Sequence, residues 1–327
     1  MVGLKMDLTR RVFVAGVAAA APAATAPAAA AAPSKTRSAP VPRFLVPTVT
    51  PVDRAGNFDE PLWRDMLSFF NDKGADGALV LGTTGEFSSF SVKERQKILE
   101  STVKNKGNLE IVAHVGTTNL PETMELMLHA GKVGADSVLI VPPFYIKKVP
   151  LEGLVRYYSA LLDAARIPVF LYHIPAASGI PISNELVTAL SQYDMLYGIK
   201  DSSGSQEGLL AFIKRFPRLK VFTGIPNLIE LVIRSGGGGA ISGAGNVFPG
   251  ETAAVFRAAR AGQDITAPLA KLNQVTSLLT GGDVGSLKFI LGELGLRESF
   301  CRLPMVTELT AERKAALRQV VAKYRAG

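Results

Sequence analysis

The sequence predicts an α/β fold, a (β/α)8 TIM barrel followed by a C-terminal helical extension. After Arg43, short apolar runs alternate with longer amphipathic segments, and Gly, Pro or Asp marks each change. The apolar runs are continuous rather than alternating, which is typical of strands buried on both faces of a parallel sheet. Hydrophobic residues make up 47% of the 327 residues and charged residues 20%, so the chain can bury a large core.

Eight strand–helix units follow one another along the chain, which fits a closed barrel. We expect strands at Phe44–Val49, Gly77–Gly82, Glu110–Gly116, Ser137–Pro142, Pro168–His173, Leu196–Lys200, Lys220–Gly224 and Gly239–Ser242. In the first helix, Leu62, Met66, Leu67 and Phe70 recur at helical spacing. A doubly wound open sheet is the alternative fold, but the chain carries no mixed-sheet signal.

Only helical patterns follow the last strand. They cover Glu251–Ala261, Thr266–Leu279, Ser286–Leu294 and Ala311–Tyr324. The domain boundaries predicted from these patterns are 1–43 for a leader and linker, 44–248 for the barrel and 249–327 for the extension.

The leader has the composition of an export signal. Arg10 and Arg11 precede a short apolar stretch, and thirteen of the eighteen residues from Ala15 to Ala32 are alanine. A charged start, a short apolar run and small residues are typical of a signal peptide, and the arginine pair resembles a twin-arginine signal. We therefore expect a periplasmic or exported enzyme. The alternative is an Ala/Pro tail on a cytoplasmic protein.

Charge and cysteine content exclude several classes of function. The leader holds six basic residues against one acidic residue, so the rest of the chain keeps only +3 of the net +8. A chain segment with so small a net charge lacks the broad basic surface of a nucleic-acid-binding protein. Cys301 is the single cysteine, and the simplest interpretation is a small packed side chain. With only three histidines besides, the chain has few ligands for a metal site. We expect no metal, no cofactor and no membrane association after processing.

A lysine closes the sixth predicted strand, where barrels carry their working groups. Partial desolvation disfavours an ammonium, and a neutral amine such as that of Lys200 can form a Schiff base with a ketone. Tyr172 closes the preceding strand, so its phenol should be a neighbour able to pass a proton. The alternative interpretation of Lys200 is an ion pair with Asp201 or another acid.

Two further features could belong to the same site. The turn Gly82-Thr83-Thr84-Gly85-Glu86 offers two hydroxyls and backbone N–H groups able to hold a carboxylate. Tyr145, after the fourth strand, offers a second phenol. Taken singly, the turn could be a plain strand–helix connection and each tyrosine an aromatic with a satisfied hydroxyl.

Together these motifs resemble the dihydrodipicolinate synthase/N-acetylneuraminate lyase family of pyruvate-dependent Schiff-base aldolases. The likeness runs from Phe44 to the end of the chain. It rests on Gly82–Glu86, Pro143-Phe144-Tyr145, Tyr172-His173-Ile174-Pro175 with Ser178-Gly179, Gly198-Ile199-Lys200-Asp201, Gly239-Ala240-Ile241-Ser242 with Asn246, and Arg302-Leu303-Pro304-Met305.

The resemblance implies a role for each matching residue. Lys200 would form the Schiff base, and Tyr172 would shuttle protons and position the substrate carboxylate. Thr83 would link the tyrosines, Thr84 would bind the pyruvyl carboxylate, and the backbone of Ile241 would contact the pyruvyl group. Tyr145 would cross a tight dimer interface within a homotetramer. The substrates would be a 2-oxo acid, pyruvate, and an aldehyde.

Departures from the family pattern narrow the expected activity. Ala177 stands where the synthase branch has an arginine for its second substrate, and Ile225-Pro226-Asn227 stand where the lyase branch has an acidic pair. Phe87 and Val92 replace the polar residues of a lysine feedback site. The expectation is therefore an aldolase or lyase resembling 2-keto-3-deoxy sugar acid aldolases and N-acetylneuraminate lyase, with 4-hydroxy-tetrahydrodipicolinate synthase as an alternative. The role of His173 stays open.

Two other classes compete with this interpretation. An exported barrel could bind a small acid without turning it over, since both second-substrate motifs are missing. A nucleotide-binding enzyme would rest on Gly243-Ala244-Gly245, but Phe248 stands where the dinucleotide pattern needs its third glycine.

Overall fold

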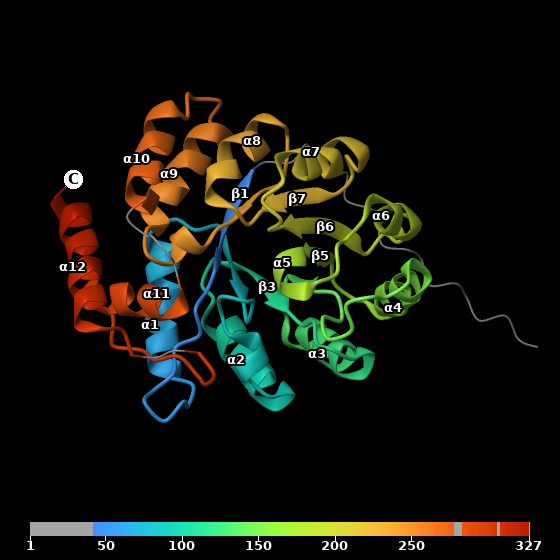
Figure 1. Cartoon of the computed structure of the whole chain (residues 1–327), viewed down its shortest axis with the longest axis horizontal. Helices are drawn as coiled ribbons and strands as arrows, with labels where there is room; N and C mark the ends of the chain where they lie inside the picture. The colour runs from blue at the N-terminus through green and yellow to red at the C-terminus, as the bar shows by residue number, and fades with distance from the viewer. Residues whose placement is uncertain (1–41, 278–282, 306–307, 327) are drawn as a thin grey trace, which may run out of the picture. The chain divides into compact units, whose positions relative to one another are not determined.

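Eight parallel strands close into a single barrel, which confirms the predicted fold (Figure 1). The computed structural model describes residues 42–277, 283–305 and 308–326. Each strand pairs with its neighbours in sequence order, and β8 returns to β1. The strands are β1 Arg43–Pro47, β2 Gly77–Val80, β3 Glu110–His114, β4 Ser137–Ile140, β5 Val169–His173, β6 Leu196–Asp201, β7 Lys220–Thr223 and β8 Gly239–Ile241.

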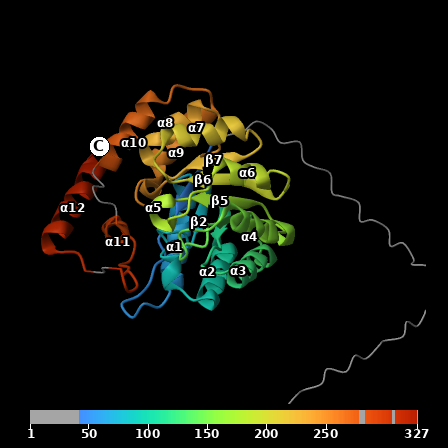
Figure 2. The same ribbon diagram turned by 45° about the vertical axis from the view of Figure 1, so that its right-hand side comes forward.

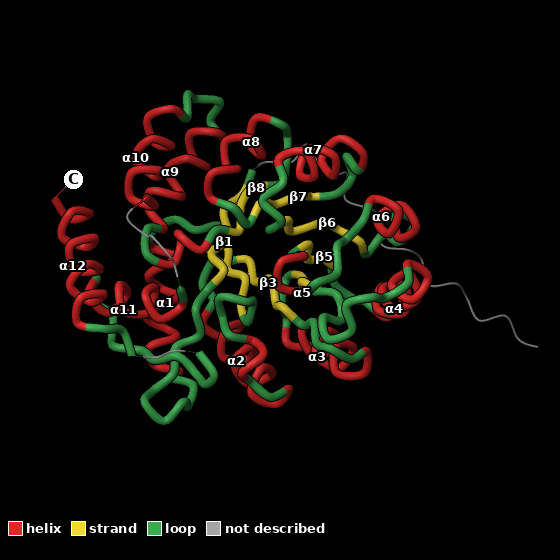
Figure 3. Tube along the Cα trace, in the orientation of Figure 1, coloured by secondary structure: helices red, strands yellow, loops and turns green. Residues whose placement is uncertain are grey.

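Helices surround the strands on the outside (Figure 3). The ring consists of α1 Glu60–Asp72, α2 Val92–Asn105, α3 Leu120–Val133, α4 Leu151–Ala164, α6 Asn184–Leu190, α7 Gln206–Arg215, α8 Ile229–Arg234 and α9 Pro249–Arg260. Short helices occupy some of the connections: α5 Pro175–Ser178 and the 3-10 helices η1 Phe87–Ser89, η2 Pro226–Leu228 and η3 Gly243–Asn246.

Local signals in the sequence fix where the first two helices begin. The Asp59 carboxylate accepts a hydrogen bond from the N–H of Leu62 at 3.0 Å, and Pro61 needs no N–H at this position. Ser91 and Glu94 form a capping box at the start of α2, each side chain accepting from the other's backbone. The loops that join β1 to α1 and β2 to α2 lie at the carboxyl ends of the strands. We call this end of the barrel the barrel mouth.

Two apolar layers hold the barrel together. One lies between strands and helices, and the other fills the barrel interior with side chains from alternate strand positions. The interior layer consists of Leu45, Leu79, Val112, Leu139, Val141, Phe170, Tyr172, Phe222 and Ile241. Continuous burial on both faces explains why the strands lack an alternating polar pattern.

The helix α9 belongs to the ring rather than to the extension. It follows β8, and its Phe256 stacks on Phe44 of β1 with ring centroids 6.0 Å apart. Arg260 at its end forms an ion pair with Asp76 at 2.7 Å. The boundary predicted at residue 248 lies before this helix, because a helical pattern alone does not tell a ring helix from an appended one, and the domain division stays a prediction.

The C-terminal extension comprises α10 Thr266–Ser277, α11 Val284–Glu293 and α12 Ala311–Ala326 (Figure 2). The helix α12 is tied to the barrel where Tyr324 packs on Phe248 and donates a hydrogen bond to Glu251 at 3.0 Å. Residues 278 and 279, predicted to end a helix, lie outside the described residues, as does the predicted export signal up to residue 41. Within the described ranges, no helix is both long and apolar enough to cross a membrane.

Candidate active site

Lys200 and Tyr172 meet at the barrel mouth. They are register partners on β6 and β5, and their side chains are buried, with 4% and 3% of each residue exposed. The Lys200 Nζ atom lies 4.5 Å from the centroid of the Tyr172 ring. A buried amine against an aromatic face is unusual, because lysine is almost never fully buried without a partner.

Two glycines lie in close contact with neighbouring groups near this lysine. A Cβ atom on Gly198 would lie 2.3 Å from the Lys220 carbonyl oxygen and 2.4 Å from the Phe170 ring. A Cβ atom on Gly224 would lie 2.0 Å from the hydroxyl of Ser202 and 3.4 Å from Cε of Lys200. Since real Cβ atoms do not approach a backbone carbonyl so closely, the strands can pack as they do only with glycine at position 198. A Cβ atom at position 224 would instead force the Ser202 hydroxyl to turn away.

The Tyr172 phenol has an altered acidity. Burial alone raises the pKa of Tyr172, but the nearby Lys200 charge and hydrogen bonding with Thr83, Ser202 and Lys200 outweigh it, so the pKa is lowered from its ordinary value. The Thr83 hydroxyl lies 3.5 Å from the phenol oxygen. A phenol of lowered pKa exchanges protons more readily near neutral pH.

Ser202 is a site residue that the sequence analysis did not single out. Its hydroxyl contributes to lowering the pKa of Tyr172, and its N–H donates to the His173 carbonyl at 2.8 Å. A signal was available, because residues two apart on a strand share a face and Ser202 comes two after Lys200.

The loop Gly82–Glu86 connects β2 to η1 and brings Thr83 and Thr84 to the mouth. The N–H of Glu86 donates to the Thr83 carbonyl at 3.1 Å, and the carbonyl of Gly85 accepts from the Thr50 hydroxyl at 2.8 Å. The side chain of Thr83 is exposed and that of Thr84 is half-buried, so both hydroxyls are within reach of a small molecule. Ile241 closes β8 in the same interior layer as Tyr172.

Tyr145 does not join this group. It follows β4, is 82% exposed, and no described contact links it to Tyr172 or Thr83. Ile146 beside it is also exposed, and both line an apolar cavity of about 470 Å³ with Thr118, Pro143, Val149, Gly153, Leu154 and Tyr157.

The neighbouring histidines are packed within the protein. His173 Nδ1 accepts from the Ile182 N–H at 3.0 Å, and its ring packs edge-on against Phe212. Burial lowers the pKa of His173 although Asp201 opposes the shift. His173 thus anchors the segment that carries α5, on which Ala177 is exposed.

His114 closes β3 inside the barrel, with its ring centroid 4.4 Å from that of Phe87 and 6.2 Å from that of Tyr172. Burial lowers the pKa of His114 well below its ordinary value, and the charges of Arg95 and Lys200 lower it further. The imidazole is therefore neutral at pH 7, and His114 is a packed histidine rather than a charged one.

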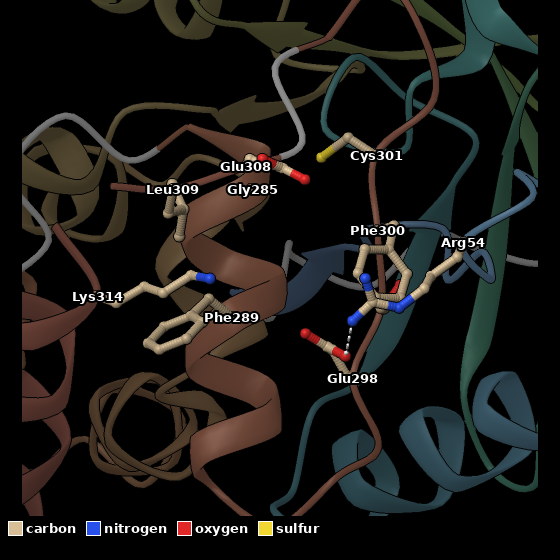
Figure 4. A pocket seen from close by; sticks show the side chains of 10 residues that line it. Arg54, Gly285, Phe289, Glu298, Phe300, Cys301, Glu308, Leu309 and Lys314 are labelled. Carbon is tan, nitrogen blue, oxygen red and sulfur yellow. Dashed lines mark hydrogen bonds and ion pairs between the residues drawn. The ribbon is translucent and has the colours of Figure 1, made fainter. Parts of the chain in front are cut away.

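Another cavity, of about 350 Å³, is lined by none of the residues of the Lys200 site. Figure 4 shows the side chains that line it. The cavity lies between α11 and residues 298–301, and Arg54 and Glu298 form an ion pair of 3.2 Å at its side. Cys301 lines it, and burial raises the pKa of this thiol to about 11, so the cysteine is a packed side chain rather than a nucleophile. Among the described residues, no group of three or more His, Cys, Asp or Glu is arranged to hold a metal ion.

Comparison with known proteins decides the family. The sequence profile of the Dihydrodipicolinate synthetase family matches residues 40–324. The chain belongs to this family. As a member of the dihydrodipicolinate synthetase family, it is a carbon–carbon lyase of the class I aldolase type.

Relatives and solved structures agree with this assignment. An uncharacterized DapA-like lyase of Chloroflexus aurantiacus is 39% identical over 267 residues, covering 80% of this chain and 89% of the relative. A 4-hydroxy-tetrahydrodipicolinate synthase of Aromatoleum aromaticum is 31% identical, covering 86% and 97%. YagE, a prophage protein of the dihydrodipicolinic acid synthase family from E. coli K12 crystallised with pyruvate, superposes with a TM-score of 0.81 at 28% identity, covering 87% and 98%.

Proposed function

We propose that this enzyme makes or breaks a carbon–carbon bond of a 2-oxo acid through a Schiff base on Lys200, with pyruvate as donor or product. The observation that carries the proposal is the buried Lys200 amine against the Tyr172 ring. A solved relative, YagE, holds pyruvate, which supports the same donor here.

In the proposed chemistry the Lys200 ammonium first loses a proton, and its amine then attacks the C2 carbonyl carbon of pyruvate. A C–N bond forms, the carbonyl oxygen leaves as water after taking up protons, and an iminium remains. The iminium withdraws electrons from the C3–H bond, so loss of that proton gives an enamine. The enamine carbon then attacks an aldehyde carbon, whose oxygen takes up a proton to become a hydroxyl, and the iminium forms again. Water adds to this iminium and releases the product acid from the Lys200 amine. Cleavage is the same sequence reversed.

Tyr172 is the proposed proton carrier. Its lowered pKa and its position beside Lys200 suit a group that takes up and returns protons during iminium formation and hydrolysis. Thr83 would relay protons from Tyr172, and Thr84 would hold the substrate carboxylate with backbone N–H groups of the loop. The backbone of Ile241 would contact the pyruvyl group.

A second copy of the chain would complete the relay. Tyr145 and Ile146 are exposed beside an apolar cavity, and an exposed apolar face of this kind is commonly covered by a partner. Together with the resemblance to the family, this exposed face leads us to propose a tight dimer within a homotetramer, in which Tyr145 of the partner subunit reaches the Thr83 hydroxyl.

The proposed substrates are 2-keto-3-deoxy sugar acids or N-acylated sugar acids rather than aspartate semialdehyde. Ala177 carries only a methyl group, so it cannot form the paired hydrogen bonds that an arginine gives a second carboxylate. The name of the Aromatoleum relative keeps synthase activity as the second candidate.

A substrate screen tests the proposed function. Purified enzyme is offered 2-keto-3-deoxy acids, sialic acid, and pyruvate with aspartate semialdehyde, and products are identified by mass spectrometry. We expect cleavage of a 2-keto-3-deoxy acid to pyruvate and an aldehyde, abolished by Lys200→Ala and retained by the exposed control Lys214→Ala. If 2-oxo acids bind but none turns over, and binding survives Lys200→Ala, a non-catalytic binding protein is the better conclusion.

A further inference from the structure

A buried ion pair joins the Gly82–Glu86 loop to the C-terminal extension. Lys288 Nζ, from α11, lies 2.5 Å from Oε1 of Glu86, and both side chains are only 1% exposed. The two residues stand 202 positions apart in the chain. Neither belongs to the Schiff-base machinery proposed above.

Glu86 and Lys288 also form hydrogen bonds with the backbone of the segment 300–302. The second carboxylate oxygen of Glu86 accepts the backbone N–H of Arg302 at 2.9 Å, and Lys288 also donates to the Phe300 carbonyl at 2.5 Å. A buried charge that loses its partner is strongly destabilised, so this arrangement holds Glu86 in one position.

The Arg302 side chain clamps the residues that follow the loop. Its guanidinium donates to the carbonyls of Gly56 at 2.7 Å and Ser89 at 2.8 Å and to Glu94 at 2.6 Å. It also stacks over the Phe90 ring at 4.1 Å. Arg302 thus holds the residues between η1 and the start of α2 in place through these contacts.

The loop needs such fastening because its backbone is strained at both ends. Leu81 and Glu86 adopt φ of 56° and 55°, in the left-handed region that residues with a Cβ atom rarely occupy. Residues in such conformations persist only where their surroundings fix them. Between these two points lie Thr83, whose hydroxyl meets the Tyr172 phenol at 3.5 Å, and Thr84.

We propose that Lys288 is a positioning residue for the substrate-binding loop, acting through Glu86. The C-terminal extension then has a function in the reaction: it holds the two threonine hydroxyls where the substrate carboxylate and the phenol need them. The inference rests on the proposed function, since it assumes that this loop binds the carboxylate of pyruvate. A purely structural tie would lower stability without changing how pyruvate binds.

The test compares Lys288→Met with a control of similar size and charge change, Arg260→Met. Arg260 ties α9 to Asp76 at the opposite end of the barrel, so its loss removes an ion pair without touching the loop. Each variant is reduced with borohydride over a range of pyruvate concentrations, and the concentration giving half-maximal adduct on Lys200 is measured. Deuterium exchange at the pyruvate methyl group and thermal unfolding are measured on the same samples.

For Lys288→Met we expect full adduct at saturating pyruvate and slower exchange of the pyruvate methyl protons. The pyruvate concentration that gives half-maximal adduct should rise about tenfold, the effect expected when one hydrogen bond to a charged group is lost. For Arg260→Met we expect a lower unfolding temperature with an unchanged half-maximal concentration. Equal half-maximal concentrations in wild type and Lys288→Met would overturn the inference. If Lys288→Met does not fold, Glu86→Gln carries the same test, because the amide keeps the shape and one acceptor oxygen. If the wild type itself forms no adduct, the proposed function fails instead.

Discussion

The Nζ atom of Lys200 lies 4.5 Å from the ring centroid of Tyr172, and the two residues are register partners on neighbouring strands. This pairing places a cation against a phenol that is already buried. Burial would raise the phenol's pKa, yet the lysine charge and hydrogen bonding lower it. An amine and a proton carrier of adjusted acidity are the two groups that Schiff-base chemistry needs.

Tyr172→Phe should lower turnover by about 10²–10⁴-fold, the usual contribution of a positioned acid–base group. The ring and its packing remain, so the unfolding temperature should change little. Steady-state kinetics with the substrate found in the screen measures the effect, and Tyr193→Phe serves as the control, since Tyr193 is half-buried in the connection between α6 and β6. Unchanged turnover in Tyr172→Phe would remove the phenol from the mechanism.

Gly224→Ala should reduce turnover by about 100-fold, as displacement of a reacting group by about 1 Å can do. The new methyl group would collide with the Ser202 hydroxyl, which must turn away from the phenol, and it would lie against Lys200 at 3.4 Å. Gly243→Ala is the matched control, because no atom lies within 4 Å of a Cβ added there. Kinetics and thermal unfolding of both variants measure the difference, and equal activity in the two would contradict it.

Stability should fall as the pH drops below about 6.5, the pKa of an unfolded histidine. The pKa values of His114 and His173 are lowered in the folded protein, so the unfolded chain takes up more protons in this range and is favoured. Denaturant titrations at pH 7 and pH 5 measure the slope of the free energy of unfolding against pH. His114→Gln should flatten this slope, and an unchanged slope in that variant would contradict the assignment.

Export should depend on the arginine pair of the leader. Replacing both residues, Arg10→Lys with Arg11→Lys, should leave the uncleaved chain inside bacterial cells that otherwise export it, because the twin-arginine route requires the pair. Cell fractionation and immunoblotting compare the two forms, with Lys5→Arg as the control. Equal distribution of both forms would mean that the leader is not a twin-arginine signal.

Most of the fold could be predicted from the chain because each strand is a short apolar run with a clear stop. All eight predicted strands occur, although several end earlier than predicted. The second strand was predicted to reach Gly82 but ends at Val80, because Leu81 turns into the left-handed region. Such a conformation is not visible in the hydrophobic pattern.

The site could be predicted where its residues close a strand or, like Thr83, lie in the turn that follows one. Lys200 and Tyr172 do so, and the barrel topology then brings them together. The Glu86–Lys288 pair could not be predicted, since a contact across 202 positions leaves no periodic signal and a lysine on a helix suggests a solvated face. Tyr145 was assigned to the site only through the family resemblance, and it is exposed in the single chain, so its role stays a prediction.

Covalent capture of pyruvate at a single lysine tests the proposed mechanism most directly. Wild-type enzyme is incubated with pyruvate, reduced with borohydride, digested and analysed by peptide mass spectrometry. We predict one carboxyethyl group per chain on the peptide that contains Lys200, absent when borohydride or pyruvate is left out. An unmodified Lys200 peptide, or a label spread over exposed lysines such as Lys214, would contradict a Schiff base at the barrel mouth.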